Sequence, residues 1–261
     1  MIFRSLLADS RHTVAAVVLA VLLVSSAPNA SALDQPMRPE AAGHEGMSMP
    51  MDEPTQMDAA RQSKLLADKK ESEFNHHLAG LFVILAGVFI LAQGTLSQRW
   101  SFLRFAWPAC FLLSGLFLLV FSDTELWPFG PQSWSYGLTH NPEDLQHKIF
   151  AVILLALGIL EVQRLRGVLK SAWARWLFPA LACFGSVLLL FHEHHSGMHG
   201  AAHMTTMARI KAEHLNFAAT GFGIGVFRGV SEIPTRWQET FAKLWPLLMI
   251  LLGVLLVLYH E

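Results

Sequence analysis

Residues 77–96 read HLAGLFVILAGVFILAQGTL, a run without a single charged side chain. A helix of about 20 apolar residues spans the hydrocarbon core of a bilayer. Further apolar runs follow it at 102–121, 149–160, 176–191, 215–227 and 244–259. Because a backbone inside a bilayer must satisfy its own hydrogen bonds, we expect all of these runs to be helical. The sequence therefore predicts an all-α, polytopic membrane protein with six transmembrane helices.

The overall composition agrees with this fold class. Of the 261 residues, 53% are hydrophobic and only 15% are charged, a balance typical of membrane proteins rather than soluble enzymes. The net charge of −1 offers no basic face for a nucleic acid, so the lipid bilayer is the first expected partner. Cys110 and Cys183 lie in separate apolar runs and form neither a disulfide framework nor a CxxC site. We interpret them as buried thiols.

The N-terminal residues 1–32 are typical of a secretory signal peptide. Arg4 and Arg11 supply positive charge, residues 14–24 an apolar core, and 30–32 read Ala-Ser-Ala, a small-residue cleavage site. An uncleaved anchor is the alternative interpretation. In either case, the chain that follows is expected outside the cytoplasm.

Residues 33–72 are rich in Pro, Ala, Met and charged residues and are predicted to form a disordered linker. Met47, Met49 and Met51 lie within HEGMSMPM at 44–51. Thioethers are soft ligands that favour Cu(I), so this segment is a candidate capture strand for copper. A plain tether with chance methionines is the alternative. The bundle itself is predicted to occupy residues 73–261.

Positive charge predicts how the bundle is oriented. The connectors after the first, third and fifth runs hold Arg99, Arg104, Arg164, Arg166, Lys170, Arg175, Arg228, Arg236 and Lys243. The other two connectors hold only Lys148, Arg209 and Lys211. The positive-inside rule places the first group in the cytoplasm, in agreement with the signal peptide. We therefore predict a multi-pass protein of a bacterial-type inner membrane, with the linker and the loop near residue 195 in the periplasm.

The apolar runs also share a spaced pattern. The odd runs carry His-x10-Gly, at His76 and Gly87, His147 and Gly158, and His214 and Gly225. The even runs begin with an aromatic residue and proline, at Trp107-Pro108, Phe178-Pro179 and Trp245-Pro246. Such recurrence predicts three repeated helical hairpins, 73–123, 144–195 and 211–261. The alternative is the general likeness of membrane helices in Leu, Gly and Phe.

The predicted topology collects polar donors on one side of the membrane, where the odd helices begin and the even helices end. These donors are His76, His77, His147, His214, His260, Glu73 and Asp123. Ionisable groups at the edge of a membrane core usually face a bundle interior or a polar cavity. If the hairpins pack around a common axis, these side chains converge at the outer mouth.

The segment 191–214, FHEHHSGMHGAAHMTTMARIKAEH, adds further donors on the same side. Its candidate metal ligands are His192, Glu193, His194, His195, Met198, His199 and His203. Imidazole suits copper, zinc and iron, and thioethers favour Cu(I), so copper as Cu(I) or Cu(II) is the expected metal, with zinc, iron and haem open. A solvated histidine-rich loop is the alternative.

With its signal-led bundle, its outward histidines and the segments HEGMSMPM and HEHHSGMHGAAHM, the chain resembles the copper-resistance D-type inner-membrane proteins over residues 44–261. The resemblance implies a protein that moves or holds copper at the inner membrane, beside a periplasmic copper carrier. Whether the protein is an enzyme stays open, and an enzyme is the less expected alternative. Three other interpretations stay open: a di-iron or copper oxidoreductase with its site at the outer mouth, a haem-b electron carrier, and a non-catalytic scaffold.

Overall fold

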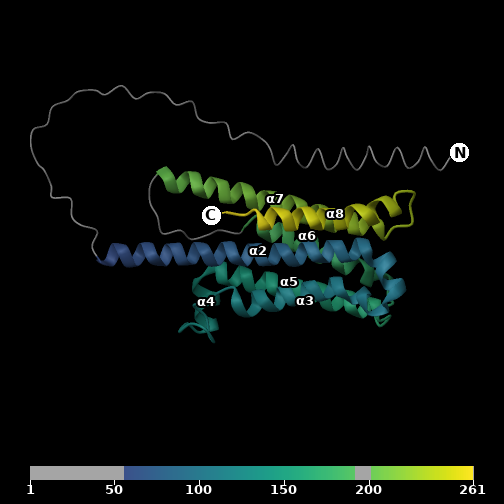
Figure 1. Ribbon diagram of the computed structural model, residues 1–261, viewed down its shortest axis with the longest axis horizontal. Helices are drawn as coiled ribbons and strands as arrows, with labels where there is room; N and C mark the ends of the chain where they lie inside the picture. The colour runs from purple at the N-terminus through teal and green to yellow at the C-terminus, as the bar shows by residue number, and fades with distance from the viewer. Residues whose placement is uncertain (1–55, 192–200, 261) are drawn as a thin grey trace, which may run out of the picture. The chain divides into compact units, whose positions relative to one another are not determined.

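The computed structural model describes residues 56–191 and 201–260, and these residues are almost entirely helical (Figure 1). The elements are α2 (Gln56–Arg99), η1 (Ser101–Phe105), α3 (Ala106–Phe121), α4 (Trp134–His140), α5 (Pro142–Leu165), η2 (Ala172–Trp176), α6 (Leu177–Leu189), α7 (Ala201–Ser231) and α8 (Gln238–Val257). The chain divides into two compact units between Leu65 and Leu66. The bundle discussed below is the second unit, residues 66–261.

The predicted all-α class is confirmed, and each predicted apolar run overlaps a helix. Five segments of the described residues are long and apolar enough to cross a membrane: Gln62–Gly94, Ser101–Phe121, Pro142–Leu165, Ala172–Leu189 and Gln238–Val257. These segments support a multi-pass membrane protein. α7, which contains the predicted run 215–227, is not among them. Asn216, Thr220 and Arg228 interrupt its apolar sequence.

The first helix of the bundle begins much earlier than the predicted boundary at residue 73. α2 is continuous from Gln56, so its first turns occupy the end of the stretch expected to be a disordered linker. Good helix formers such as Ala, Leu, Lys and Gln dominate these turns, and Lys69 lies 3.8 Å from Glu73 as an i,i+4 ion pair. The predicted signal peptide 1–32 and the linker residues 33–55 lie outside the described residues.

The start of α5 is fixed by a local capping arrangement. The side chain of Asn141 accepts a hydrogen bond from the Glu143 backbone N–H, and Pro142 occupies the first helical position. Glu143 and Asp144 lie in the first turn, where negative charge complements the helix dipole. This cap sets the helical register that brings His147 to the inner face of the bundle.

Close helix pairs form where glycine meets the carbonyl of a helical proline. A Cβ atom at Gly87 of α2 would lie 2.8 Å from the Pro246 carbonyl of α8. The same construction at Gly158 of α5 gives 3.1 Å to the Pro108 carbonyl, and at Gly225 of α7 it gives 2.9 Å to the Pro179 carbonyl. Small residues allow such close backbone approach between membrane helices. These glycine contacts join α2 to α8, α3 to α5, and α6 to α7.

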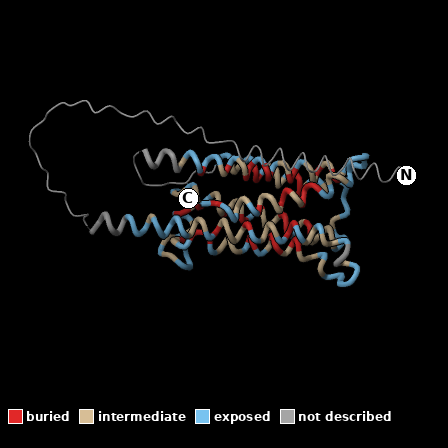
Figure 2. Tube along the Cα trace, turned by 45° about the horizontal axis from the view of Figure 1, so that its top comes forward, coloured by how far each residue is buried: buried red, intermediate tan, exposed pale blue. Residues whose placement is uncertain are grey.

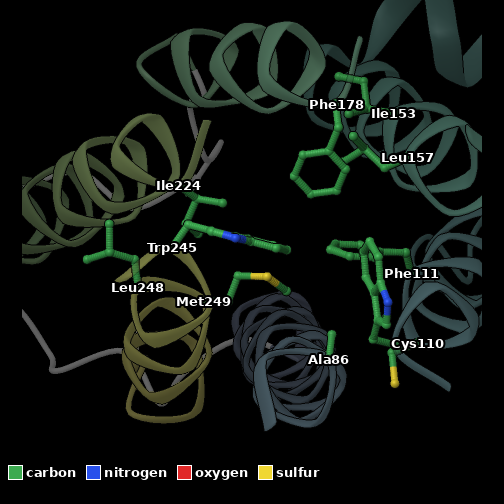
Figure 3. Close-up of a cluster of buried hydrophobic side chains, with 11 residues drawn as sticks. Ala86, Cys110, Phe111, Ile153, Leu157, Phe178, Ile224, Trp245, Leu248 and Met249 are labelled. Carbon is green, nitrogen blue, oxygen red and sulfur yellow. The ribbon is translucent and has the colours of Figure 1, made fainter. Parts of the chain in front are cut away.

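Three rings meet in the middle of the bundle, and we call Trp107, Phe178 and Trp245 the aromatic triad. Their ring centroids lie 6.3, 5.8 and 6.1 Å apart in edge-to-face geometry. Each side chain is at most 4% exposed. The buried residues run along the inward faces of the helices (Figure 2), and six helices, α2, α3, α5, α6, α7 and α8, contribute side chains to this core (Figure 3).

Candidate functional site

The two ends of the bundle carry different chemistry. We call the end that holds His76, His147 and His214 the histidine end, and the end that holds Arg164 and Arg228 the arginine end. At the histidine end, α2 contacts the residues that follow α3 and α8, α5 contacts those that follow α3 and α6, and α7 contacts those that follow α8. Donors that are distant in the sequence therefore lie next to one another.

A cavity of about 230 Å³ runs inward from the histidine end. Side chains from α2, α3, α5, α6, α7 and α8 line it, and the polar ones are Asn75, His76, Ser114, His147, Ser186 and His214. From His147 to Leu157, both of which line the cavity, α5 rises about 15 Å at 1.5 Å per residue. Phe178 also lines it, so the aromatic triad lies at its inner end.

The three cavity histidines are held in the same way, each through its Nδ1 atom. In His76, Nδ1 donates a hydrogen bond to the Ser72 carbonyl at 2.8 Å, and in His214 to the Ile210 carbonyl at 2.8 Å. In His147, Nδ1 lies 2.7 Å from Oδ1 of Asp123. Because these oxygens can only accept, Nδ1 is the donor in each ring, and the neutral form of each imidazole has its lone pair on Nε2.

Asp123 is the centre of a buried polar cluster. Besides His147, its carboxylate accepts hydrogen bonds from Nζ of Lys148 at 2.6 Å and Oγ of Ser122 at 2.6 Å. Burial raises the pKa of Asp123, but the hydrogen bonds and charges of its partners outweigh this effect, so its pKa lies below the usual value. Asn75 of α2 donates to the Ser122 carbonyl at 3.0 Å, which ties α2 to the end of α3.

His76 and His214 also belong to a ring cluster with Tyr259. The His76 ring stacks on Tyr259 with centroids 4.1 Å apart, and the His214 ring meets Tyr259 edge-on at 5.8 Å. The two imidazole centroids are 5.9 Å apart. His214 is 3% exposed and Tyr259 is 1% exposed, so these rings are part of the bundle interior.

His77, His260 and Glu73 occupy a separate rim. Nε2 of His77 donates to the Tyr259 carbonyl at 3.0 Å, and the His77 ring lies 5.8 Å from that of His260. Nδ1 of His260 is 3.8 Å from Oε1 of Glu73, and the His260 side chain is exposed. Neighbouring histidines in the sequence thus lie in different surroundings, because His76 lines the cavity whereas His77 does not.

Within residues 56–191 and 201–260, the structure shows no group of three His, Cys, Asp or Glu side chains placed to hold a metal ion. Several predicted ligands lie outside the described residues: His192, Glu193, His194, His195, Met198, His199, Met47, Met49 and Met51. His203 lies in α7, but its side chain is also outside the description.

At the arginine end, a cation lies against two rings of the aromatic triad. The Arg228 guanidinium lies 4.9 Å from the Trp245 ring centroid and 6.0 Å from that of Phe178. A desolvated cation–π contact of this kind contributes about 2 kcal/mol. The cation and the rings together separate the cavity from the arginine end.

An ion network holds Arg228 in this position. Its Nη2 lies 2.9 Å from Oε1 of Glu232 and 3.7 Å from Oε1 of Glu161. Arg164 bridges the same two carboxylates, at 3.0 Å from Glu232 and 3.2 Å from Glu161. Glu161 is only 3% exposed, so its charge depends on these two guanidinium groups.

Sequence reasoning missed three residues of the histidine end. The sequence pattern presents Lys148 only as a connector charge, whereas the structure shows it 6% exposed and paired with Asp123. Its position directly before the apolar run 149–160 was the available signal, since a charge at a membrane edge usually has a partner. Asn75 and Tyr259 carried no such signal, because their roles arise from contacts between distant helices.

Comparisons of the chain with protein-family models, curated proteins and solved structures find no match.

Proposed function

We propose that this protein binds a soft or borderline metal ion, copper first of all, at the histidine end, and that it holds this metal as cargo at the inner membrane. In this proposal, the histidine end faces the periplasm and the arginine end faces the cytoplasm, because the predicted cytoplasmic connectors carry most of the positive charge. The function agrees with the resemblance to copper-resistance D-type proteins and with a periplasmic copper carrier as partner.

The observation that carries the proposal is the common anchoring of His76, His147 and His214. Metal-binding histidines almost always donate their second ring N–H to a carboxylate or a backbone carbonyl, which fixes the tautomer and the ring. All three cavity histidines have such a bond from Nδ1, at 2.7 to 2.8 Å. This arrangement supports Nε2 as the donor atom toward a metal at the mouth of the cavity.

The donors that complete the coordination are proposed to come from the segments rich in His and Met. Two imidazoles of the bundle, His76 and His214, have centroids 5.9 Å apart and therefore require only a modest movement to share one ion. The segment 191–214 supplies further imidazoles and thioethers in sequence, and Met47, Met49 and Met51 supply a capture strand.

A threefold repeat with six membrane crossings remains part of this proposal, with α7 as the sixth crossing. The three glycine–proline carbonyl contacts and the aromatic triad join residues at corresponding places of the sequence pattern, which supports it. In such an arrangement, the three anchored imidazoles correspond to one another around a common axis. This accounts for one shared cavity rather than three separate sites.

The test is elemental analysis of the purified full chain after loading with Cu(I) and with Zn²⁺. We expect bound copper to fall in a His76→Phe/His214→Phe variant and in a variant with His192, His194 and His195 changed to Ala. A matched control is His140→Ala, because His140 is an exposed residue whose ring stacks on Tyr136 at 4.3 Å. Unchanged copper content in both variants would overturn the proposal. A Soret band in the visible spectrum would instead indicate haem.

A further inference from the structure

The cavity extends far along the axis of the bundle. On α6 its lining residues run from Phe178 to Leu189, and on α7 they run from His214 to Ile224. At 1.5 Å per residue, each of these stretches is about 15–16 Å long. A sphere of 230 Å³ is only about 8 Å across, so the cavity is elongated parallel to the helices. It is also much larger than a metal ion requires.

The walls of the cavity are almost entirely apolar. All six helices contribute apolar side chains to them, among them Phe178, Ile224 and Met249 (Figure 3). Among the described residues that line the cavity there is no Asp, Glu, Lys or Arg. The side chains of Asn75 and Ser186 donate their hydrogen bonds to backbone carbonyls of the protein, at 3.0 and 2.7 Å. Such walls stabilise a hydrocarbon group through close contacts.

The shape of the cavity selects among apolar ligands. An engineered apolar cavity of about 150 Å³ in another protein stays dry and binds benzene, so a compact ring needs less space than the bundle offers. A compact ligand leaves the ends of an elongated cavity unfilled, and unfilled volume is unfavourable. An extended alkyl chain advances about 1.25 Å per carbon, so about 12 carbons reach along 15 Å. The bilayer around the bundle consists of such chains.

We propose that the cavity binds one unbranched alkyl chain, which extends along the bundle axis from the histidine end to the aromatic triad. The chain belongs to a free fatty acid or alcohol, or to the tail of a membrane lipid. This inference goes beyond metal binding and does not depend on it. It accounts for the apolar volume below the three imidazoles, which a metal at the mouth of the cavity leaves unexplained.

The test is photolabelling of the full chain in lipid nanodiscs, with a chelator present. The probe is 1-dodecanol with a diazirine in the middle of its chain, and mass spectrometry locates the label. We expect saturable labelling of lining residues such as Leu181, Ile224 and Met249. The exposed residues Leu113 and Val152 should take up label in proportion to the probe concentration, as contact with bulk lipid predicts. Labelling of the lining residues that does not saturate would overturn the proposal.

A pair of competitors tests the shape of the ligand. 1-Decanol and 1-adamantanol both have ten carbons and one hydroxyl group, but the first is an extended chain and the second a compact cage. At equal concentrations in the lipid, we expect 1-decanol to displace the probe at least about tenfold more effectively, because the cage leaves cavity volume unfilled. Equal displacement by the two alcohols would refute an extended chain as the ligand.

Two filling variants test the place of binding. Gly185→Leu fills the cavity, because a Cβ atom at Gly185 would lie at an ordinary 3.6 Å from Ile153, and Ala182→Phe is an independent filler. Both should abolish saturable labelling, while the thermal unfolding temperature stays near that of the wild type. Ala180→Phe is the matched control, because Ala180 is an exposed residue of the same helix, and it should leave the labelling unchanged. Saturable labelling that persists in both fillers would place the probe elsewhere and contradict the proposal.

The same photoreactive chain, esterified in a phosphatidylcholine, distinguishes the two sources of the ligand. Labelling of the lining residues by the esterified probe would identify the tail of a membrane lipid, and labelling by the free alcohol alone would identify a free chain. Labelling by neither would refute the proposal. Saturable labelling without copper uptake would remove only the metal function, and copper uptake without such labelling would remove only this inference.

Discussion

Neutralising Asp123 should destabilise the bundle more than any other single loss of charge at the histidine end. Asp123 is 8% exposed, and its carboxylate accepts hydrogen bonds from His147, Lys148 and Ser122 at 2.6 to 2.7 Å. In Asp123→Asn, the ammonium of Lys148 loses its counter-charge, and His147 loses a charged hydrogen-bond acceptor. Lys148 is only 6% exposed, so its charge stays buried. Breaking one partner of a buried ion pair costs about 3–5 kcal/mol, so we expect a loss of that size.

The assay is equilibrium unfolding of the purified protein in mixed micelles of a mild detergent and SDS. The double variant Asp123→Asn/Lys148→Met tests the stated cause, because it removes the stranded charge as well. It should recover at least half of the loss, since replacing both members of a buried pair is often nearly neutral. Asp68→Asn, at an exposed position of α2, serves as the control and should change stability by less than about 0.5 kcal/mol.

Two outcomes would refute this reasoning. A loss below about 1 kcal/mol in Asp123→Asn would mean that the carboxylate behaves like a surface charge. A double variant no more stable than the single one would mean that the stranded ammonium is not the cause. Either result would remove the basis for treating Asp123 as the anchor of His147.

Other perturbations test the packing and the electrostatics. Gly225→Leu should destabilise the bundle by about 3 kcal/mol or more, because a Cβ atom there would lie 2.9 Å from a carbonyl of the neighbouring helix. Gly94→Leu is the control and should change stability little, since a Cβ atom there has nothing within 4 Å. Equal effects of the two variants in SDS titration would contradict the packing. By the same titration, Arg228→Met should lower the free energy of unfolding by about 2–4 kcal/mol. Arg236 lies over an exposed ring at 5.0 Å, so Arg236→Met should lower it by less than about 1 kcal/mol. The pKa of Asp123 is lowered in the folded state, so its contribution to stability should be fully present at a pH above its usual pKa of 3.8 and be lost as the pH falls below that value. If the stability advantage of the wild type over Asp123→Asn shrank between pH 8 and pH 5, this sign would be contradicted.

The sequence was sufficient to predict the apolar helices, because their signal is composition over a window of bilayer length. It also singled out His76, His147 and His214, which the structure brings to one cavity. Their shared spacing to a glycine was the useful clue, since a glycine that allows close helix contact fixes the depth and direction of the histidine above it. Periodic patterns of this kind carry three-dimensional information even in a single sequence.

Other features depend on contacts that no local pattern contains. The sequence does not reveal that Gly87 packs against Pro246, because the two residues lie at opposite ends of the bundle sequence. It also does not distinguish His76 from His77, which differ only in the side of the helix they occupy. The early start of α2 differs from the predicted linker because its first turns have a low hydrophobicity, which is typical of disorder, whereas their alanine, leucine and lysine residues are good helix formers.

The residues at the two ends of the cavity oppose passage of a ligand through the bundle more than they oppose its binding and release at the histidine end. A ligand that moved on toward the arginine end would have to separate the aromatic triad and displace Arg228 from Trp245, 4.9 Å away. Aromatic pairs contribute about 0.5–1.5 kcal/mol each and a desolvated cation–π contact about 2 kcal/mol, so several kcal/mol oppose this route before Glu161 loses a counter-charge. At the histidine end, the same ligand meets imidazoles whose tautomers are already set. In the proposed function, this difference favours holding a ligand that enters at the histidine end, and transport through the bundle would require a second arrangement of α7 and α8.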